Sequence, residues 1–238
     1  MSSIVSDAPA DTRPLAVVTG ASKGFGLEVA RALAAGGWDV VTLSRSRSVE
    51  LDQVPFLTQV QGDVASADLA GLVATVGDRP VDLLVNNAGV GGTGTNLASL
   101  SADELEHCFS VNVWGPARVS GALLPNLRLG AHPLVVNITS RLASLNRQAS
   151  GEYRHLSSSY AYRITKAAQN MLTVCMAAEL GASVRVWAVH PGRLRTAMAV
   201  ADADGDPAEA AERLVTLVQA DTETQLAYIA LDEGPLPW

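Results

Sequence analysis

The sequence of 238 residues predicts a single α/β domain built around a doubly wound parallel sheet. Short apolar runs alternate along the chain with longer segments of helical periodicity. A glycine-rich turn, TGASKGFG, joins the first apolar run to the first helical segment. Hydrophobic residues make up 48% of the chain, which is enough for one large core, and no internal repeat or change of composition marks a second domain.

The apolar runs predict strands at residues 15–19, 38–43, 81–86, 133–139 and 184–189, with a further strand just before residue 62. They are almost continuously hydrophobic, as parallel strands buried on both faces should be. Helical periodicity marks residues 24–36, 66–77, 101–124, 160–180 and 208–219. Right-handed crossovers between such strands put helices on both faces of the sheet and a ligand crevice at the carboxyl ends of the strands.

The ends and the composition narrow the class of protein. Residues 1–13 are expected to form a flexible tail, and residues 14–238 the folded domain. A net charge of −7 disfavours binding to nucleic acid or to an anionic membrane. Cys108 and Cys175 lie far apart without further ligands at metal-binding spacing, so neither a metal site nor a disulfide framework is predicted. No apolar run is long enough to span a bilayer, and a cytoplasmic protein is expected.

The glycine-rich turn is the first candidate binding element. Glycines at positions 20, 24 and 26 suit a backbone that turns tightly and approaches a ligand closely, and a helix N-terminus suits a pyrophosphate. A turn and helix start without a ligand would use the same glycines, but the position directly after the first strand favours a dinucleotide. The residues expected to contact it are Gly20, Ser22, Lys23, Gly24, Phe25 and Gly26.

The end of the second strand predicts which dinucleotide is bound. Ser44 stands where an NAD site would offer a carboxylate to the ribose 2′-hydroxyl, and Arg45 and Arg47 follow it. A 2′-phosphate would favour Arg45 and Lys23, which predicts NADP(H), although both cations could instead be solvated surface residues. Asp63 and Val64, after the third strand, are placed near the adenine, and Asp63 could equally be a turn residue.

Two further motifs follow the fourth strand. Asn87, Ala88 and Gly89 in NNAG suit the close approach of a flat ligand, with a plain turn as the alternative. Asn112 lies in a helical segment in which Asn is a mediocre helix former. The following pair Gly115–Pro116 should distort that helix, so Asn112 is a candidate for holding a water molecule.

Residues 157–169, SSSYAYRITKAAQ, contain the candidate general acid. Tyr162 and Lys166 are four residues apart and share one helix face, whereas Ile164 lies four beyond Tyr160. A nearby ammonium favours the phenolate, so such a pair is a tunable acid or base, although an exposed helix pair occurs by chance as well. Ser140, at the end of the fifth strand, is placed to hydrogen-bond a substrate carbonyl.

Together, TGASKGFG, NNAG, Asn112, Ser140, YRITK and HPG resemble, in this order, the classical short-chain dehydrogenase/reductase family with its Rossmann fold. The resemblance implies that Tyr162 protonates the carbonyl oxygen and Ser140 positions it. Lys166 then binds the nicotinamide ribose and lowers the phenol pKa, and Asn112 holds a relay water. It also implies nicotinamide contacts at Pro191, Gly192 and Thr196. The C-terminal DEGPLPW resembles the carbonyl-reductase-like branch.

The segment of 21 residues between Ser140 and Tyr162 is longer than this family usually has. Its basic side chains suggest an anionic substrate or merely exposed loop charge; they are Arg141, Arg147, Arg154 and His155. His190, in HPG, is interpreted as a structural residue before a turn rather than as a catalyst. The resemblance further implies a homodimer or homotetramer, unless the long segment blocks the helix interface and leaves a monomer.

The leading functional hypothesis is an NADPH-dependent reductase of a small or medium ketone or aldehyde, or the reverse alcohol dehydrogenase. A cofactor-binding regulator without turnover is a second hypothesis, against which the intact Ser140, Tyr162 and Lys166 speak. Epimerisation or dehydration of a biosynthetic intermediate is a third, because the same tyrosine and lysine could support it.

Overall fold

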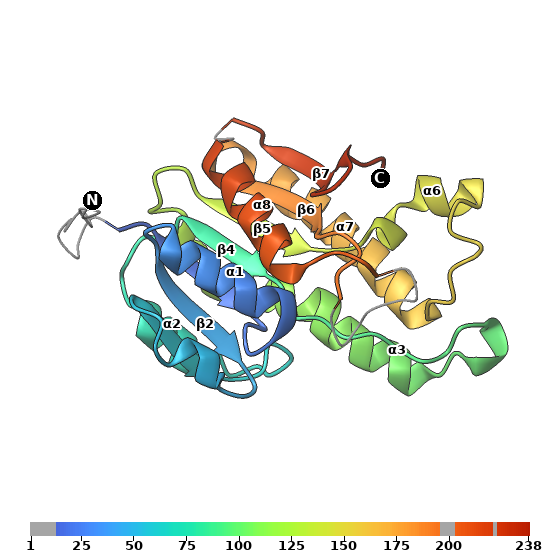
Figure 1. Ribbon diagram of the computed structural model, residues 1–238, viewed down its shortest axis with the longest axis horizontal. Helices are drawn as coiled ribbons and strands as arrows, with labels where there is room; N and C mark the ends of the chain where they lie inside the picture. The colour runs from blue at the N-terminus through green and yellow to red at the C-terminus, as the bar shows by residue number, and fades with distance from the viewer. Residues whose placement is uncertain (1–12, 196–202, 221–222) are drawn as a thin grey trace.

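The computed structural model describes residues 13–195, 203–220 and 223–238. Its eight strands form one sheet in the order β3-β2-β1-β4-β5-β6-β7-β8 (Figure 1). The first seven strands are parallel and β8 is antiparallel to β7. The strands are β1 Leu15–Thr19, β2 Asp39–Ser44, β3 Leu57–Gln61, β4 Leu83–Asn86, β5 Leu134–Ile138, β6 Arg185–His190, β7 Leu226–Ala230 and β8 Gly234–Pro235. The predicted α/β fold class is confirmed.

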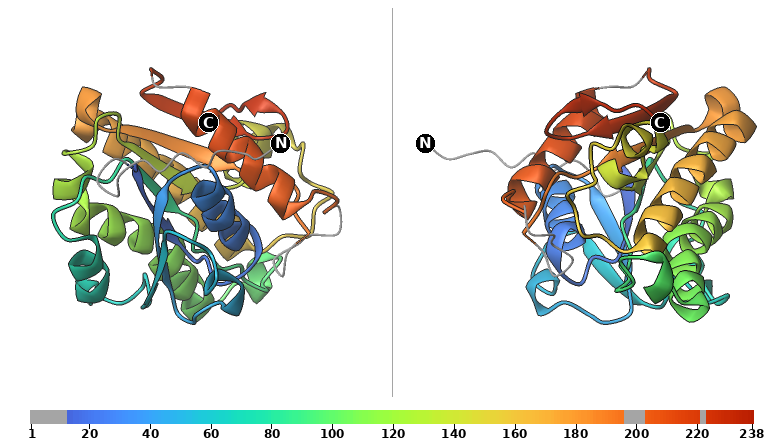
Figure 2. Two further views of the ribbon diagram at one scale, coloured as in Figure 1. Left: turned by 60° about the vertical axis from the view of Figure 1, so that its left-hand side comes forward. Right: turned by 90° about the vertical axis from the view of Figure 1, so that its right-hand side faces the viewer.

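Helices cover both faces of the sheet (Figures 1 and 2). Helices α1 and α8 pack on one face, over Val18, Val40 and Val136. The adjacent residues Val17, Val41 and Val135 face the helices of the other layer. Within the described residues, the α-helices are α1 Gly24–Ala35, α2 Ala70–Val76, α3 Ala102–Phe109, α4 Gly115–Ala122, α5 Leu124–Leu127, α6 Leu145–Ser150, α7 Tyr160–Leu180 and α8 Pro207–Ala220. This alternation is why the strands read as unbroken apolar runs.

The predicted helix at residues 101–124 is divided in the structure. A π-helical turn, Ser110–Trp114, separates α3 from α4, and α4 in turn ends before α5. Pro116 lies in the first turn of α4, where its missing N–H is tolerated; inside one continuous helix its ring would clash with the carbonyl of Asn112. The distortion expected at Gly115–Pro116 is confirmed, and the expectation of one long helix is wrong.

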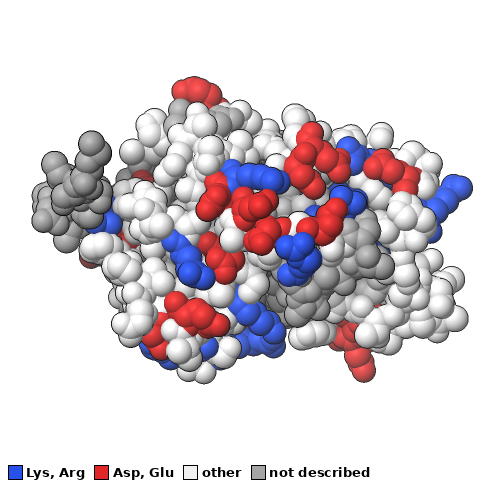
Figure 3. Space-filling model, in the orientation of Figure 1, with Lys and Arg blue, Asp and Glu red and all other residues white. Residues whose placement is uncertain are grey.

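The surface carries charges of both signs. In the view of Figure 3, acidic and basic side chains are interspersed rather than segregated. Surface ion pairs include Arg31–Glu28 and Arg213–Glu209. Among the described residues, no helix has both the length and the apolar character needed to cross a membrane. Of the predicted N-terminal tail, residues 1–12 lie outside the described part of the chain.

Candidate active site

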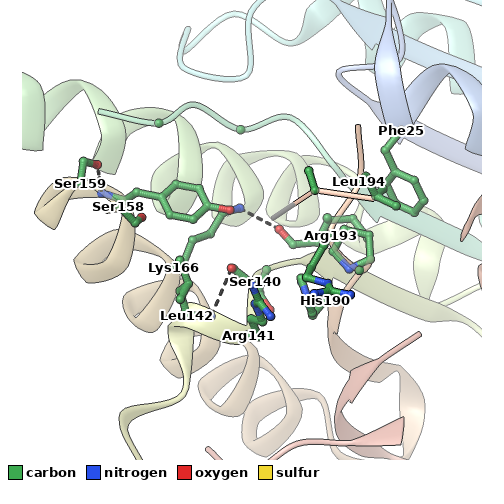
Figure 4. Close-up of a pocket in the computed structure, with 18 of the residues that line it drawn as sticks. Phe25, Ser140, Arg141, Leu142, Ser158, Ser159, Lys166, His190, Arg193 and Leu194 are labelled. Atoms are coloured by element: carbon green, nitrogen blue, oxygen red, sulfur yellow. Dashed lines mark hydrogen bonds between the residues drawn. The ribbon is translucent and has the colours of Figure 1, made fainter. Parts of the chain in front are cut away.

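A cleft of about 510 Å³ lies at the carboxyl ends of β4, β5 and β6 (Figure 4). This is where a doubly wound sheet binds its ligands. The residues that line it come from the glycine-rich turn, the strand ends and α7; they include Phe25, Asn87, Ser140, Tyr162, Lys166 and Gly192. The structure therefore brings together three of the four predicted catalytic residues with residues of three predicted cofactor motifs.

The backbone holds the serine and the tyrosine of the cleft in place. The Ser140 hydroxyl accepts a hydrogen bond from the N–H of Leu142 at 3.2 Å, in the turn that follows β5. The Ser159 hydroxyl caps α7 by accepting from the N–H of Tyr162 at 3.0 Å. Tyr160, by contrast, is 38% exposed, so Tyr162 is the tyrosine of the cleft.

Lys166 is almost completely buried behind the tyrosine. Its ammonium donates to the carbonyl of Ile138 at 2.8 Å and to the side-chain oxygen of Gln169 at 2.9 Å. The Nζ atom lies 5.9 Å from the centre of the Tyr162 ring. Since the i, i+4 spacing places both side chains on one face of α7, the predicted pairing of Tyr162 and Lys166 is present in the structure.

Burial controls the protonation of this pair. It raises the pKa of Tyr162, and the hydrogen bond with Ser140 acts in the opposite direction but more weakly. Burial also lowers the pKa of Lys166 to about 7. The phenol pKa is therefore raised by desolvation, contrary to the lowering by Lys166 that the sequence predicted. Tyr162 is a protonated acid at neutral pH, next to an amine that exchanges protons in the same pH range.

Asn112 lies in the π-helical turn and is fully buried. Its side chain accepts from the N–H of Val90 and donates to the Val90 carbonyl and to the Thr165 hydroxyl, each at 2.9 Å. It thereby ties the loop after β4 to α7, one residue from Lys166. Asn112 lies behind the cleft wall rather than in it, and its role in holding a water stays a prediction.

The glycine-rich turn packs closely against NNAG. Gly20 has a φ of +69°, and a Cβ atom at this position would lie 2.7 Å from the Cα atom of Ala88. The side-chain amide of Asn87 donates to the carbonyls of Thr19 and Gly20 at 2.9 and 3.1 Å. The Asn87 amide therefore satisfies backbone groups at the end of the neighbouring strand. Only glycine fits this cradle, which suits the close approach of a pyrophosphate at the start of α1.

The end of β2 is joined to the same turn. The buried Ser44 hydroxyl accepts from the N–H of Ala21 at 2.8 Å, while Arg45 and Lys23 are exposed. Arg47 forms an ion pair with Asp52 at 2.7 Å. The hydrogen bond between Ala21 and Ser44 thus connects the backbone segment of Lys23 with that of Arg45. This arrangement is compatible with a 2′-phosphate bound between the two side chains.

The remaining predicted cofactor residues have local structural roles or flank the cleft. Asp63 accepts from the N–H of Ala65 at 2.9 Å in a turn, and Val64 is buried. Pro191 and Gly192 line the cleft, and Gly192 has a φ of +100°. Thr196 lies outside the described residues.

The long segment before Tyr162 contributes only part of its charge to the site. Arg141 lines the cleft. Arg147 instead binds the Tyr153 hydroxyl and Glu233, at 3.0 and 2.9 Å, so it is tied to the C-terminal segment. Arg154 and His155 are exposed and are not among the residues that line the cleft.

Two features, one in the cleft and one beside it, were not predicted from the sequence. His190, at the end of β6, lines the cleft rather than only preceding a turn. The Tyr228 hydroxyl donates at 2.6 Å to the carbonyl of Ser140, 88 residues earlier in the chain, and the Trp238 ring lies 5.2 Å from the Tyr228 ring. The histidine is visible in the HPG motif, whereas no local pattern signals the tyrosine contact.

Comparisons with known proteins identify the family of this chain. Residues 14–206 match the short chain dehydrogenase family. L-xylulose reductase of Bos taurus is 36% identical over 202 residues, which cover 82% of this chain and 77% of the bovine protein. C-signal of Myxococcus xanthus is 40% identical over 125 residues, 52% of this chain and 72% of that protein.

Solved structures show the same fold. The NADPH-bound carbonyl reductase from chicken fatty liver has a TM-score of 0.83 at 22% identity, covering 95% of this chain and 100% of that one. A carbonyl reductase from Pseudomonas aeruginosa PAO1 has a TM-score of 0.79 at 26% identity, covering 94% of this chain and 100% of that one. The chain belongs to the short-chain dehydrogenase family, in its carbonyl-reductase-like branch.

Proposed function

We propose that this protein is an NADP(H)-dependent reductase of small or medium carbonyl compounds, with Tyr162 as the general acid. The observation that carries the proposal is the presence of the Ser140 hydroxyl and the protonated Tyr162 phenol in one cleft, with Lys166 buried behind them. The cleft also adjoins a glycine cradle that suits a dinucleotide pyrophosphate. A binding protein without turnover has no need of this acid and its partners.

The residues of the chain divide the reaction between them. When bound, NADPH supplies the hydride that adds to the carbonyl carbon. The Ser140 hydroxyl accepts from Leu142 and forms a hydrogen bond with Tyr162, and its proton can turn to the carbonyl oxygen of a bound substrate. Tyr162 gives its phenolic proton to the same oxygen, which completes the alcohol. Lys166 binds the nicotinamide ribose hydroxyls and, when charged, stabilises the phenolate that remains.

The preference for NADP(H) rests on the end of β2. A site for NAD usually offers a carboxylate to the ribose 2′-hydroxyl, and this chain has Ser44 there. Arg45 and Lys23 are exposed beside it and can pair with a 2′-phosphate. Arg45→Ala should therefore weaken binding of NADPH and leave binding of NADH almost unchanged, with Arg47→Ala as the matched control on the same loop.

The experiment that tests this function is NADPH oxidation by the purified protein across aldehydes, ketones, diketones, quinones and β-keto esters. Turnover is expected with NADPH in preference to NADH. Tyr162→Phe should reduce kcat by roughly 10²–10⁴-fold, the usual contribution of a general acid. Products formed without net NADPH consumption would favour the non-redox hypothesis over this one. Tight binding of NADPH without any turnover would favour the hypothesis of a cofactor-binding regulator.

We also propose self-association in the cytoplasm through α7 and the π-helical turn next to α4. Trp114, Ile164 and Met171 on these elements are 53%, 42% and 61% exposed, so the segment before Tyr162 does not cover them. Light scattering should give the mass of a dimer or tetramer, and Met171→Asp should reduce it. A monomeric mass at micromolar concentration would contradict this proposal.

A further inference from the structure

Gln169 is a buried amide that contacts the proposed catalytic lysine. It lies three residues after Lys166 on the same face of α7, and none of its surface is exposed. Its side-chain oxygen accepts a hydrogen bond from the Lys166 ammonium at 2.9 Å. This contact connects a residue outside the Tyr162–Lys166 pair to the reacting groups.

Packing alone does not account for an amide at this position. The side-chain nitrogen of Gln169, Nε2, is buried without a hydrogen-bond partner. An unpaired buried donor costs free energy, and an apolar side chain of similar volume, such as methionine, would fill the same space without that cost. Within the described residues, the hydrogen bond from Lys166 is the one that the side chain of Gln169 makes, so the use of the amide lies in that bond.

The hydrogen bonds of the ammonium indicate what Gln169 does. An ammonium has three N–H donors, and two of them are directed to the Ile138 carbonyl at 2.8 Å and to the Gln169 oxygen. Two acceptors hold the end of a long and flexible side chain in one place. The third N–H remains for the cleft, which Lys166 lines together with Tyr162. Without Gln169 the ammonium would keep a single anchor, the Ile138 carbonyl.

Gln169 also favours the charged form of Lys166. Burial lowers the pKa of Lys166 to about 7, so the charged and neutral forms are nearly equal in population at neutral pH. Hydrogen bonds donated by an ammonium are stronger than those of a neutral amine. The Gln169 oxygen therefore opposes the effect of burial, and its loss should make the neutral amine predominate at pH 7.

The other titratable and charged groups around Lys166 do not take over this role. Cys108, on α3, and Tyr162 are neutral at pH 7, because burial raises the pKa of each. His190 is neutral as well, because its pKa is about 3. Among the described residues that line the cleft, the other charged side chains are Arg141 and Arg193, which repel an ammonium rather than stabilise it.

We propose that Gln169 is a positioning residue for Lys166, whose ammonium it holds in the place and in the charged form that serve the nicotinamide ribose and the Tyr162 phenolate. Gln169 is not among the residues that line the cleft, so it acts through Lys166 rather than on a substrate. This inference rests on the proposed carbonyl reductase function and adds a residue on which that reaction depends.

The test measures the protonation of Lys166 directly by NMR. The sequence contains only two lysines, Lys23 and Lys166, so protein made with lysine that carries carbon-13 at Cε gives two signals, and Lys23→Arg assigns them. Gln169→Met should lower the pKa of Lys166 by about one pH unit, because a hydrogen bond to a charged group is lost. Gln169→Glu, which offers a carboxylate oxygen instead, should raise it. Gln219→Met, at an exposed position of α8, should leave it unchanged.

The pH profile of kcat is the second measurement, with NADPH and a ketone that the wild type reduces. Since the charged lysine stabilises the phenolate, kcat should fall as the pH rises through the pKa of Lys166. The midpoint should move to lower pH in Gln169→Met and to higher pH in Gln169→Glu. At pH 8, kcat of Gln169→Met should be roughly tenfold below that of the wild type, and KM for the ketone should change little.

Two results would overturn the inference. The first is an unchanged pKa of Lys166 in Gln169→Met, and the second is a shift in the same direction in Gln169→Met and Gln169→Glu, which would indicate altered packing alone. The NMR titration needs no substrate, so it separates this inference from the proposed function. If the pKa moves as expected and no protein oxidises NADPH, the role of Gln169 stands and the reductase function fails. If the wild type reduces ketones and Gln169→Met has the same pH profile of kcat, the reductase function stands and the role of Gln169 fails.

Discussion

His190 should make the protein sensitive to acid, and replacing it with phenylalanine should remove that sensitivity. The pKa of this histidine is about 3 in the folded protein, compared with 6.5 for an ordinary histidine. Between these two values the unfolded chain binds a proton that the folded chain does not bind. The free energy of unfolding therefore decreases as the pH falls through this range, and His190→Phe lacks this contribution.

The size of the effect follows from the two pKa values. One pKa unit corresponds to about 1.4 kcal/mol. Below pH 6.5 the imidazole takes up a proton in the unfolded chain but not in the folded one, so each further pH unit lowers the free energy of unfolding by nearly that amount. The difference in unfolding free energy between the wild type and His190→Phe should shift by about 2 kcal/mol against the wild type from pH 7 to pH 5. At pH 7 the variant should already be the more stable protein, because it buries no unpaired ring nitrogens.

Urea denaturation at several pH values measures this difference directly, because effects of other titrating groups cancel between the two proteins. His132→Phe, at an exposed site, controls for the removal of an imidazole as such. Parallel stability curves for the wild type and His190→Phe from pH 7 to pH 5 would refute the reasoning. They would show that the imidazole reaches water, or finds a partner, in the folded protein.

Other substitutions test the support of the site. Tyr228→Phe removes the hydroxyl that donates to the Ser140 carbonyl, but that carbonyl keeps the N–H of Ala143 as a donor. The free energy of unfolding should therefore fall by only about 0.5–1.5 kcal/mol, while kcat falls and the affinity for NADPH is unchanged. An unchanged kcat would count against a positioning role for Tyr228. Ser44→Ala leaves the buried N–H of Ala21, in the glycine-rich turn, without its acceptor. Urea denaturation should show that the free energy of unfolding falls by about 1–3 kcal/mol, and fluorescence titration should show a weaker affinity for NADPH. Equal affinities in the wild type and the variant would contradict a role of this hydrogen bond in cofactor binding. Ser140→Ala should shift the pKa of Tyr162 further upward, since the serine hydrogen bond opposes the effect of burial, and ultraviolet difference titration against Tyr162→Phe detects this; a downward shift would contradict the assignment.

Much of the fold and of the site could be predicted because the signals are local. Buried parallel strands have continuous apolar runs, and the four-residue spacing of Tyr162 and Lys166 fixes their common helix face. The position of Ser140 follows from the end of a strand. The glycines of the first turn are also readable, since Gly20 needs both a positive φ and space for Ala88.

What could not be predicted depends on contacts between distant parts of the chain. The bond between Tyr228 and Ser140 joins residues far apart in sequence. The two residues of β8 carry no pattern, whereas β7, LAYIA, is an apolar run that could have been predicted as a strand and was not. The pKa values of Tyr162 and Lys166 depend on burial by the whole fold, which reversed the direction expected for the phenol. The burial of the His190 ring nitrogens without a hydrogen-bond partner likewise appears only in the folded structure.

The most direct test of the proposed function follows the hydride itself. The protein is incubated with a ketone that it reduces in the carbonyl panel and with NADPH that carries deuterium at both C4 positions of the nicotinamide, and mass spectrometry examines the alcohol that forms. The wild type should place one deuterium on the new carbinol carbon for each NADPH consumed, and Tyr162→Phe should do so roughly 10²–10⁴ times more slowly. A product without deuterium, or an equal rate in Tyr162→Phe, would contradict hydride transfer to a carbonyl protonated by Tyr162.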